Sequence, residues 1–157
     1  MEIDIGRGKK GRRAYGFDDI AIVPSRRTRD PDDIDISWTL GPYRFDIPLL
    51  ASAMDGVVSP DTAVLTNELG GLGVLNLEGI WTRFENAEEK LETIAAAPKH
   101  EATRLMQQIY TEPVKAELIG KRVEEIKARG AVVCASLTPQ KVREHYEVAV
   151  EDRKSVV

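Results

Sequence analysis

The chain is poor in the residue types that form covalent cross-links and metal sites. It has one cysteine, Cys134, and two histidines, His100 and His145, among its 157 residues. A lone cysteine cannot close an internal disulfide bond. Because the two histidines are far apart and lack partners at the spacing of a metal site, we expect no bound metal. We interpret Cys134, which lies inside an apolar run, as a small core residue and not as a nucleophile.

Long apolar runs and an excess of positive charge are also missing. No apolar segment approaches the ~18 residues that span a bilayer, and residues 1–6 lack the basic-then-apolar order of a secretory signal. The formal net charge is -4, which argues against a nucleic-acid partner. The basic stretch 7–13 could contact phosphates or RNA, but we interpret it as a solvated terminus. We therefore expect a cytoplasmic protein without a nucleic-acid or membrane partner.

What the sequence does contain is an alternation of short apolar runs with helical patterns. With 42% hydrophobic residues, it can bury one sizeable core. Residues 47–51, 72–75 and 131–137 are too short for helices and predict buried strands. Residues 36–40 and 43–45, separated by Gly41-Pro42, predict a hairpin before the first of them, and we place this hairpin at one end of a barrel. The pattern indicates an α/β protein with a β-α-β-α-β order and a parallel sheet.

Start and stop signals predict the helices between these strands. Ser59-Pro60 is a serine cap followed by proline at the first helical position. Further helices are expected over 84–98, 103–110, 113–130 and from Thr138-Pro139 onward. The predicted inward-facing side chains of the first and last helices are Ala63, Val64, Leu65 and Leu69, and Val142, Tyr146 and Val150. A short segment around Ile20 and Ile22 is expected to lie against a core.

Loops that follow parallel strands are where ligands bind, so residues 52–56 are the first place to look for chemistry. Residues 76–79 form the next such loop. Gly73, within the second strand, permits the close approach either of a ligand or of another backbone. We divide the chain into an N-terminal arm and hairpin (1–46), the first part of a barrel (47–151) and a tail (152–157) that we expect to be non-native, so that the chain is a fragment.

Four motifs in this order resemble the start of the IMP dehydrogenase and GMP reductase family. They are Phe17-Asp18-Asp19-Ile20 with Val23-Pro24, Ile47-Pro48-Leu49, Ser52-Ala53-Met54-Asp55, and Gly70-Gly71-Leu72-Gly73-Val74. The resemblance covers residues 12–151. It is closest to the IMP dehydrogenase-related branch that lacks the inserted CBS pair, because no such domain interrupts the chain between residues 76 and 131.

The resemblance implies a (β/α)8 barrel of about 250 residues when complete, of which this chain holds about three βα units. It implies that Ser52 and Met54 contact a purine nucleotide, IMP or GMP, and that Asn76 contacts a nicotinamide cofactor, NAD or NADP. In such enzymes a cysteine thiolate attacks C2 of the purine and hydride passes to or from the nicotinamide. That cysteine lies in a later Gly-Ser-rich loop, with the phosphate-binding glycines and a potassium site. This chain contains none of these, so we assign it no catalytic residue. The full-length enzymes are usually homotetramers.

The second loop departs from the family pattern. Asn76-Leu77-Glu78-Gly79 lacks the basic residue that both characterised branches place there, so the reaction direction stays open. We favour a fragment of an IMP dehydrogenase, which converts IMP to XMP with NAD in guanine nucleotide biosynthesis. A fragment of a GMP reductase, which converts GMP to IMP with NADPH, is the first alternative. A non-catalytic nucleotide-binding protein is the second.

Overall fold

The computed structural model describes residues 2–24 and 30–150. The chain forms two compact units, Met1–Asp35 and Ile36–Val157. In the part of the chain that is described, no helix is long and apolar enough to cross a membrane. The proposed non-native tail, 152–157, lies outside the described residues.

The first unit contains an antiparallel pair that the sequence reading missed. Strands β1 (Glu2–Asp4) and β2 (Lys10–Arg12) pair with Ile3 opposite Gly11. Two 3-10 turns follow, η1 (Phe17–Asp19) and η2 (Pro31–Asp33). The strand residues are exposed apart from the half-buried Gly11, so the stretch 7–13 is solvated as expected, but part of it is paired.

The segment around Ile20 and Ile22 does not lie against a core, so that prediction was wrong. Phe17 and Ile22 are 95% and 96% exposed, and Ile20 and Val23 are exposed as well. The unit that carries them has no buried hydrophobic residue among those described. Alternation of apolar residues indicated a packed face, but a unit this small has nothing to pack it against.

The second unit opens with the predicted hairpin. Strands β3 (Trp38–Leu40) and β4 (Tyr43–Phe45) are antiparallel, and Gly41 takes the positive φ of 58° that their turn requires. Phe45 is buried, and its ring stacks on Trp38 with centroids 5.0 Å apart. The Trp38 indole N–H donates to the Ile47 carbonyl at 2.7 Å. The hairpin is thereby fastened to the chain that enters the main sheet.

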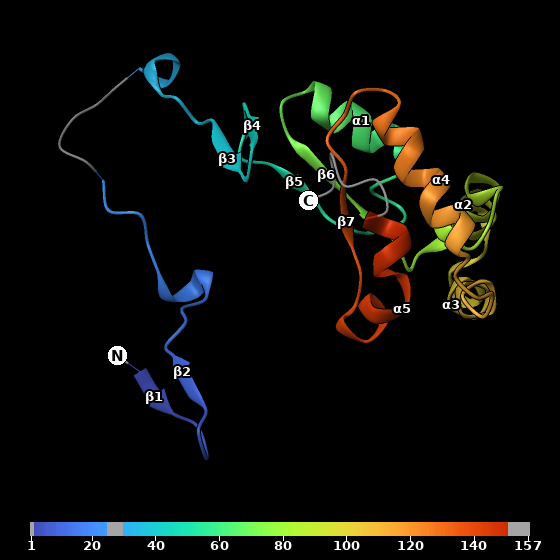
Figure 1. Cartoon of the computed structure of the whole chain (residues 1–157), viewed down its shortest axis with the longest axis horizontal. Coiled ribbons are helices and arrows are strands. Elements are labelled where there is room, and N and C mark those ends of the chain that lie inside the picture. Colours follow the sequence, from blue (N-terminus) through green and yellow to red (C-terminus); the bar gives the residue numbers. More distant parts are fainter. Residues whose placement is uncertain (1, 25–29, 151–157) are drawn as a thin grey trace. The chain divides into compact units, whose positions relative to one another are not determined.

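The main sheet has three parallel strands in the order β5-β6-β7 (Figure 1). They are β5 (Leu50–Ala51), β6 (Leu72–Asn76) and β7 (Cys134–Ser136). Ala51 pairs with Gly73, and Asn76 pairs with Ser136. The predicted β-α-β-α-β order is confirmed, and the paired parts of the first and third strands are shorter than the apolar runs that predicted them.

One helix joins the first two strands, and several elements join the next two. The helical elements are α1 (Pro60–Glu68), η3 (Ile80–Thr82), α2 (Ala87–Ala96), α3 (Lys99–Ile109), α4 (Ala116–Lys127) and α5 (Pro139–Val150). α1 packs on β6 and on α4, and α4 packs on α5. A single crossover helix completes a βα unit, so α2 and α3 are additions to the second unit.

Gly73 is the place where α1 meets the sheet. A Cβ atom at this position would lie 2.8 Å from the Ala63 Cα in α1, which is closer than packed atoms allow. Of the two roles left open for this glycine, the structure shows the close approach of another backbone. The core around this contact includes Val64, Leu75, Ile119, Ile126 and Val133, all fully buried.

The predicted inward face of the first helix was partly wrong, and that of the last helix was wrong where its residues are described. In α1, Ala63 and Val64 are buried, whereas Leu65 is exposed, and Leu69, which directly follows the helix, is 67% exposed. In α5 the buried residues are His145 and Ala149, and Val142 and Tyr146 are exposed. The side chain of Val150 lies outside the described residues. α5 packs on α4, and the face it buries there is the one with the smaller and more polar side chains.

Candidate functional site

The carboxyl ends of the three parallel strands bring the predicted site residues to one edge of the sheet. Ser52 follows β5 directly, and Asn76 is the last residue of β6. Ser136, the last residue of β7, is the register partner of Asn76. This edge, which we call the strand-end edge, is where α/β proteins bind ligands.

The loop after β5 is a compact turn that presents two of the predicted residues to solvent. The Met54 N–H donates to the Ser52 carbonyl at 2.7 Å, and the Met54 carbonyl accepts N–H groups of Val57 and Val58 at 2.8 and 2.9 Å. Ser52 is exposed, and Met54 is 56% exposed. A hydroxyl and a thioether are therefore offered at the strand-end edge by a backbone that is already hydrogen-bonded.

Asn76 begins the loop after β6 and is half-buried. Its Oδ1 accepts the N–H of Glu78 at 3.0 Å, which is an Asx turn within its own loop. The side-chain NH2 group is the part of Asn76 that could contact a ligand. The carboxylate of Glu78 in turn accepts the N–H of Thr138 at 2.5 Å, so the loops after β6 and β7 are joined.

Asp55 is the site residue that sequence reasoning missed. It is only 8% exposed, and its Oδ2 accepts the N–H of Ile80 at 2.9 Å and the hydroxyl of Tyr110. The Asp55 carbonyl accepts the indole N–H of Trp81 at 3.2 Å. Asp55 closes the Ser-Ala-Met-Asp motif, which was the one available signal, but its partners lie in elements far along the chain. Its contacts join the loop after β5 to the element that follows β6.

Tyr110 lies directly after α3, and its phenol stays protonated. Burial, together with the hydrogen bond to the Asp55 carboxylate, raises its pKa well above the ordinary range for tyrosine. The Arg83 guanidinium lies 5.4 Å from the centre of the Tyr110 ring. Arg83 also donates to the Glu78 carbonyl at 3.1 and 2.9 Å and to the Glu112 carbonyl. The end of α3 is thus fastened to both loops.

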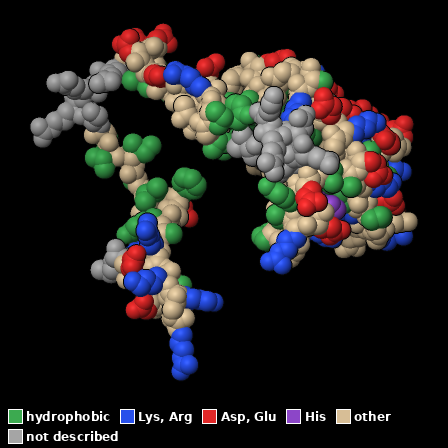
Figure 2. Space-filling view, viewed as in Figure 1, with side chains coloured by type: hydrophobic (Ala, Val, Ile, Leu, Met, Phe, Trp, Pro, Cys, Tyr) green, Lys and Arg blue, Asp and Glu red, His purple; other side chains and the backbone are tan. Residues whose placement is uncertain are grey.

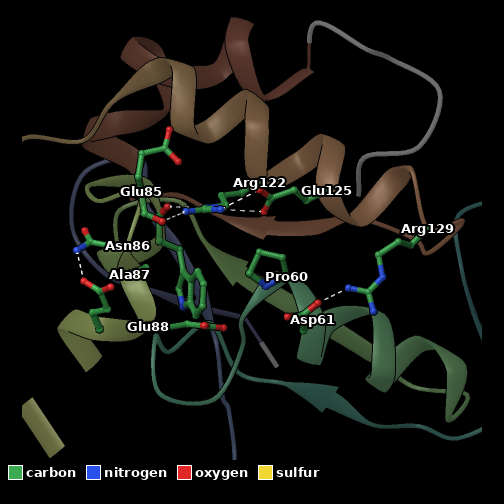
Figure 3. A pocket seen from close by; sticks show the side chains of 11 residues that line it. Pro60, Asp61, Glu85, Asn86, Ala87, Glu88, Arg122, Glu125 and Arg129 are labelled. Carbon is green, nitrogen blue, oxygen red and sulfur yellow. Dashed lines mark hydrogen bonds and ion pairs between the residues drawn. The ribbon is translucent and has the colours of Figure 1, made fainter. Parts of the chain in front are cut away.

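A pocket of about 440 Å³ lies between α1, α2 and α4, and neither Ser52, Met54 nor Asn76 lines it (Figure 3). Its guanidinium groups are already engaged, because Arg122 binds Glu125 at 2.8 and 3.0 Å and Arg129 pairs with Asp61. The pKa of Glu85 is lowered by its hydrogen bond to Lys121. Figure 2 shows acidic and basic side chains interspersed over these helices. The pocket is a charged surface whose cations are already paired.

Cys134 occupies the position expected of a structural residue. It is the first residue of β7, is half-buried, and pairs with Val74. Burial raises the pKa of its thiol, which disfavours the thiolate that a nucleophile needs. Among the described residues, no group of three or more metal-binding side chains is found.

A comparison with known protein families shows which family the chain belongs to. The profile of the IMP dehydrogenase / GMP reductase domain matches residues 14–150. The chain belongs to this family. Its predicted membership, drawn from the motifs around Asp18, Pro48, Ser52 and Gly71, is confirmed.

The relatives are longer than this chain. An uncharacterised oxidoreductase of Mycolicibacterium smegmatis is 41% identical over 143 residues, which are 88% of this chain and 38% of the relative. An inosine-5'-monophosphate dehydrogenase of Methanocaldococcus jannaschii is 31% identical over 104 residues, 66% of this chain and 20% of the relative. The chain therefore spans well under half the length of these relatives, in line with a fragment.

A solved structure supports the fold. The crystal structure of an IMP dehydrogenase/GMP reductase-like protein from Corynebacterium glutamicum superposes with a TM-score of 0.81 at 34% sequence identity. The match covers 96% of this chain and 42% of that one. The α/β fold of this family is thus shown, and the small open sheet is consistent with part of a barrel.

Proposed function

We propose that this chain is the N-terminal part of a purine-nucleotide oxidoreductase and that its strand-end edge contacts the nucleotide. The complete protein is a (β/α)8 barrel in this proposal, with β5, β6 and β7 as its first three strands. Ser52 and Met54 contact a purine nucleotide, and Asn76 contacts a nicotinamide cofactor. The observation that carries the proposal is the exposed, internally hydrogen-bonded turn with Ser52 and Met54 at the carboxyl end of β5 in a member of this family.

The chain's own residues bind and orient in this proposal, and none of them acts as a nucleophile. The Ser52 hydroxyl can donate to or accept from a polar group of the nucleotide, and Met54 offers a polarisable apolar surface to the flat purine. The nicotinamide cofactor, when bound, supplies hydride chemistry. Asn76 offers its NH2 group as one contact, which is not a complete cofactor site. Because Cys134 is half-buried in a strand with a raised pKa, we propose that this chain alone is inactive.

For the direction of the reaction, we propose that the complete protein converts IMP to XMP with NAD. An IMP dehydrogenase relative supports the conversion of IMP to XMP with NAD, and the family equally includes reductases. The reaction is decided by assaying the complete reading frame with IMP and NAD and, separately, with GMP and NADPH. Formation of XMP supports the dehydrogenase, and formation of IMP supports the reductase. A complete protein that binds IMP but turns over neither pair supports the non-catalytic alternative.

Binding by the chain itself is tested by titration calorimetry with IMP, GMP and a pyrimidine control, CMP. We expect saturable binding of a purine nucleotide with no binding of CMP. Ser52→Ala should raise the Kd about 3- to 10-fold, the effect of losing one hydrogen bond. Equal affinity for CMP, or an unchanged Kd in Ser52→Ala, would refute the proposed contact. Turnover of IMP with NAD by this chain would refute its proposed inactivity.

A further inference from the structure

The loop that carries Ser52 and Met54 is held in place by the residue that follows them. Asp55 is buried, and its Oδ2 receives two hydrogen bonds, one from the Ile80 backbone and one from the Tyr110 hydroxyl. A carboxylate that accepts several hydrogen bonds in a buried setting is tightly restrained. The turn that presents Met54 is therefore anchored, through the adjacent Asp55, to elements that follow β6 in the chain.

The fit around Asp55 leaves no room for a ligand at its second oxygen. Asp55 Oδ1 has no hydrogen-bond partner among the described residues. It rests instead against Gly79, where an added Cβ atom would overlap it. The carboxylate is thus enclosed by the loop after β6 on one side and by Tyr110 on the other. This geometry is that of a structural tie between two loops and not of a binding site.

The tie uses a residue from outside the repeating βα units. Tyr110 immediately follows α3, which is one of the two added helices between β6 and β7. The phenol is protonated at neutral pH, and its raised pKa keeps the hydroxyl a donor well into the alkaline range. Arg83 holds the same end of the helix by donating to the Tyr110 carbonyl at 3.3 Å and by covering its ring.

We propose that Asp55 and Tyr110 are positioning residues that set the orientation of the turn carrying Ser52 and Met54. The inference rests on the proposed function only in so far as that turn contacts a nucleotide. α3 then has a defined role, because it positions the Tyr110 hydroxyl to donate to Asp55. Loss of that hydroxyl loosens the turn without removing any group that touches the nucleotide.

The test compares Tyr110→Phe with Tyr146→Phe in the whole chain. Tyr146 is exposed on α5, so the same chemical change there is a matched control. Amide hydrogen exchange is followed at Met54, Val57 and Val58, whose N–H groups hold the turn. We expect Tyr110→Phe to speed exchange at these amides about 10-fold and to leave α4 unchanged, since one partly buried hydrogen bond to a charged group is lost. Tyr146→Phe should change neither.

Nucleotide binding gives the second readout. The Kd for IMP should rise about 3- to 10-fold in Tyr110→Phe, and Asp55→Asn should have a similar or larger effect. Unchanged exchange in the turn, or an equal increase in α4, would overturn the inference, because the latter indicates general destabilisation. If the unmodified chain does not bind IMP, the proposed function fails, and the exchange experiment still decides whether Tyr110 positions the turn.

Discussion

Arg122 is the charged side chain that does most to hold the helices of the second unit together. It is buried, and its Nε donates to the Trp81 carbonyl at 3.0 Å. One terminal nitrogen binds both oxygens of Glu125, and the other donates to the Glu85 carbonyl at 2.9 Å. One guanidinium thereby joins α4 to η3 and to the segment between η3 and α2, because arginine presents several N–H donors in a fixed planar arrangement.

Replacing Arg122 by methionine should therefore be costly. Arg122→Met leaves the Trp81 and Glu85 carbonyl groups without their donor, and we expect a loss of about 2–4 kcal/mol in the free energy of unfolding, since each buried polar group left unpaired costs about 1–3 kcal/mol. The partly exposed Glu125 carboxylate can be solvated and adds less. The neighbouring Lys121, which pairs with Glu85 at the surface, is the control. Lys121→Met should cost less than about 1 kcal/mol. Urea titration followed by circular dichroism measures both, and equal effects would contradict the role assigned to Arg122.

The thiol of Cys134 should react slowly at neutral pH. Burial raises its pKa, so less thiolate is present at pH 7 than in a free cysteine, and the rate should climb as the pH rises toward that pKa. Alkylation by iodoacetamide between pH 7 and 10, compared with glutathione, measures this. A rate at pH 7 equal to or above that of glutathione would show an activated thiol and would contradict a structural role.

At the residue scale, motifs predicted which side chains face the strand-end edge but not what holds them there. Ser52, Met54 and Asn76 could be placed because they directly follow apolar runs. The partnership of Asp55 with Tyr110 could not, because it joins residues 55 positions apart through a helix that the βα pattern does not require. Local spacing carries no information about such a contact.

Among the elements, α1 and β6 approach each other closely at Gly73. The Cβ of an alanine at Gly73 would lie 2.8 Å from the Ala63 Cα and 3.1 Å from its Cβ. Because helix backbone cannot move aside as a flexible side chain can, Gly73→Ala should force α1 away from the sheet. We expect a loss of about 1–3 kcal/mol in stability from this overpacking.

Gly120 in α4 supplies the control for that substitution. An added Cβ there meets only Val148, at 4.0 Å, so Gly120→Ala should stabilise the chain by up to about 1 kcal/mol through helix propensity. Thermal melts of the two variants should shift in opposite directions. A shift of the same sign in both would show that the close approach at Gly73 does not constrain the packing of α1.

Helix boundaries were predictable where caps exist, and packed faces were less so. Ser59 and Pro60 begin α1 as expected, with the Ser59 hydroxyl oxygen accepting the Thr62 N–H at 3.0 Å. The face of α5 was not predictable, because its buried residues, His145 and Ala149, are a polar and a small side chain. Hydrophobicity alone predicts that the larger Val142 and Tyr146 are buried, whereas both are exposed in the structure.

The whole second unit leaves apolar surface and sheet edges uncovered. Among the described residues, β5 and β7 each pair on one side only. Exposed large side chains gather around β5 and α1, namely Leu49, Leu50, Val57, Leu65 and Leu69. Open edges beside exposed apolar side chains are surfaces that associate.

The chain alone should therefore self-associate. Sedimentation velocity between about 2 and 100 µM should show a sedimentation coefficient that rises with protein concentration. Association buries the exposed apolar side chains, and by mass action more of the chain associates as its concentration rises. Leu65→Lys, on the exposed side of α1, should reduce this association, whereas Val142→Lys on α5 serves as a control outside the β5–α1 surface. A single monomeric species over the whole range, with a concentration-independent melt, would contradict the expectation of an incomplete barrel.

The most direct test of the proposed nucleotide contact asks whether IMP slows the alkylation of a cysteine placed at position 54. Cys134 is first replaced by alanine, so that each variant has a single thiol. Met54→Cys then places this thiol at the strand-end edge, and Val142→Cys, made separately, places it at an exposed position of α5. Alkylation of each is timed with and without IMP, with CMP as the control nucleotide. The proposal predicts that IMP slows alkylation at residue 54 in a saturable way and leaves residue 142 unchanged. Equal rates at residue 54 with and without IMP would contradict it.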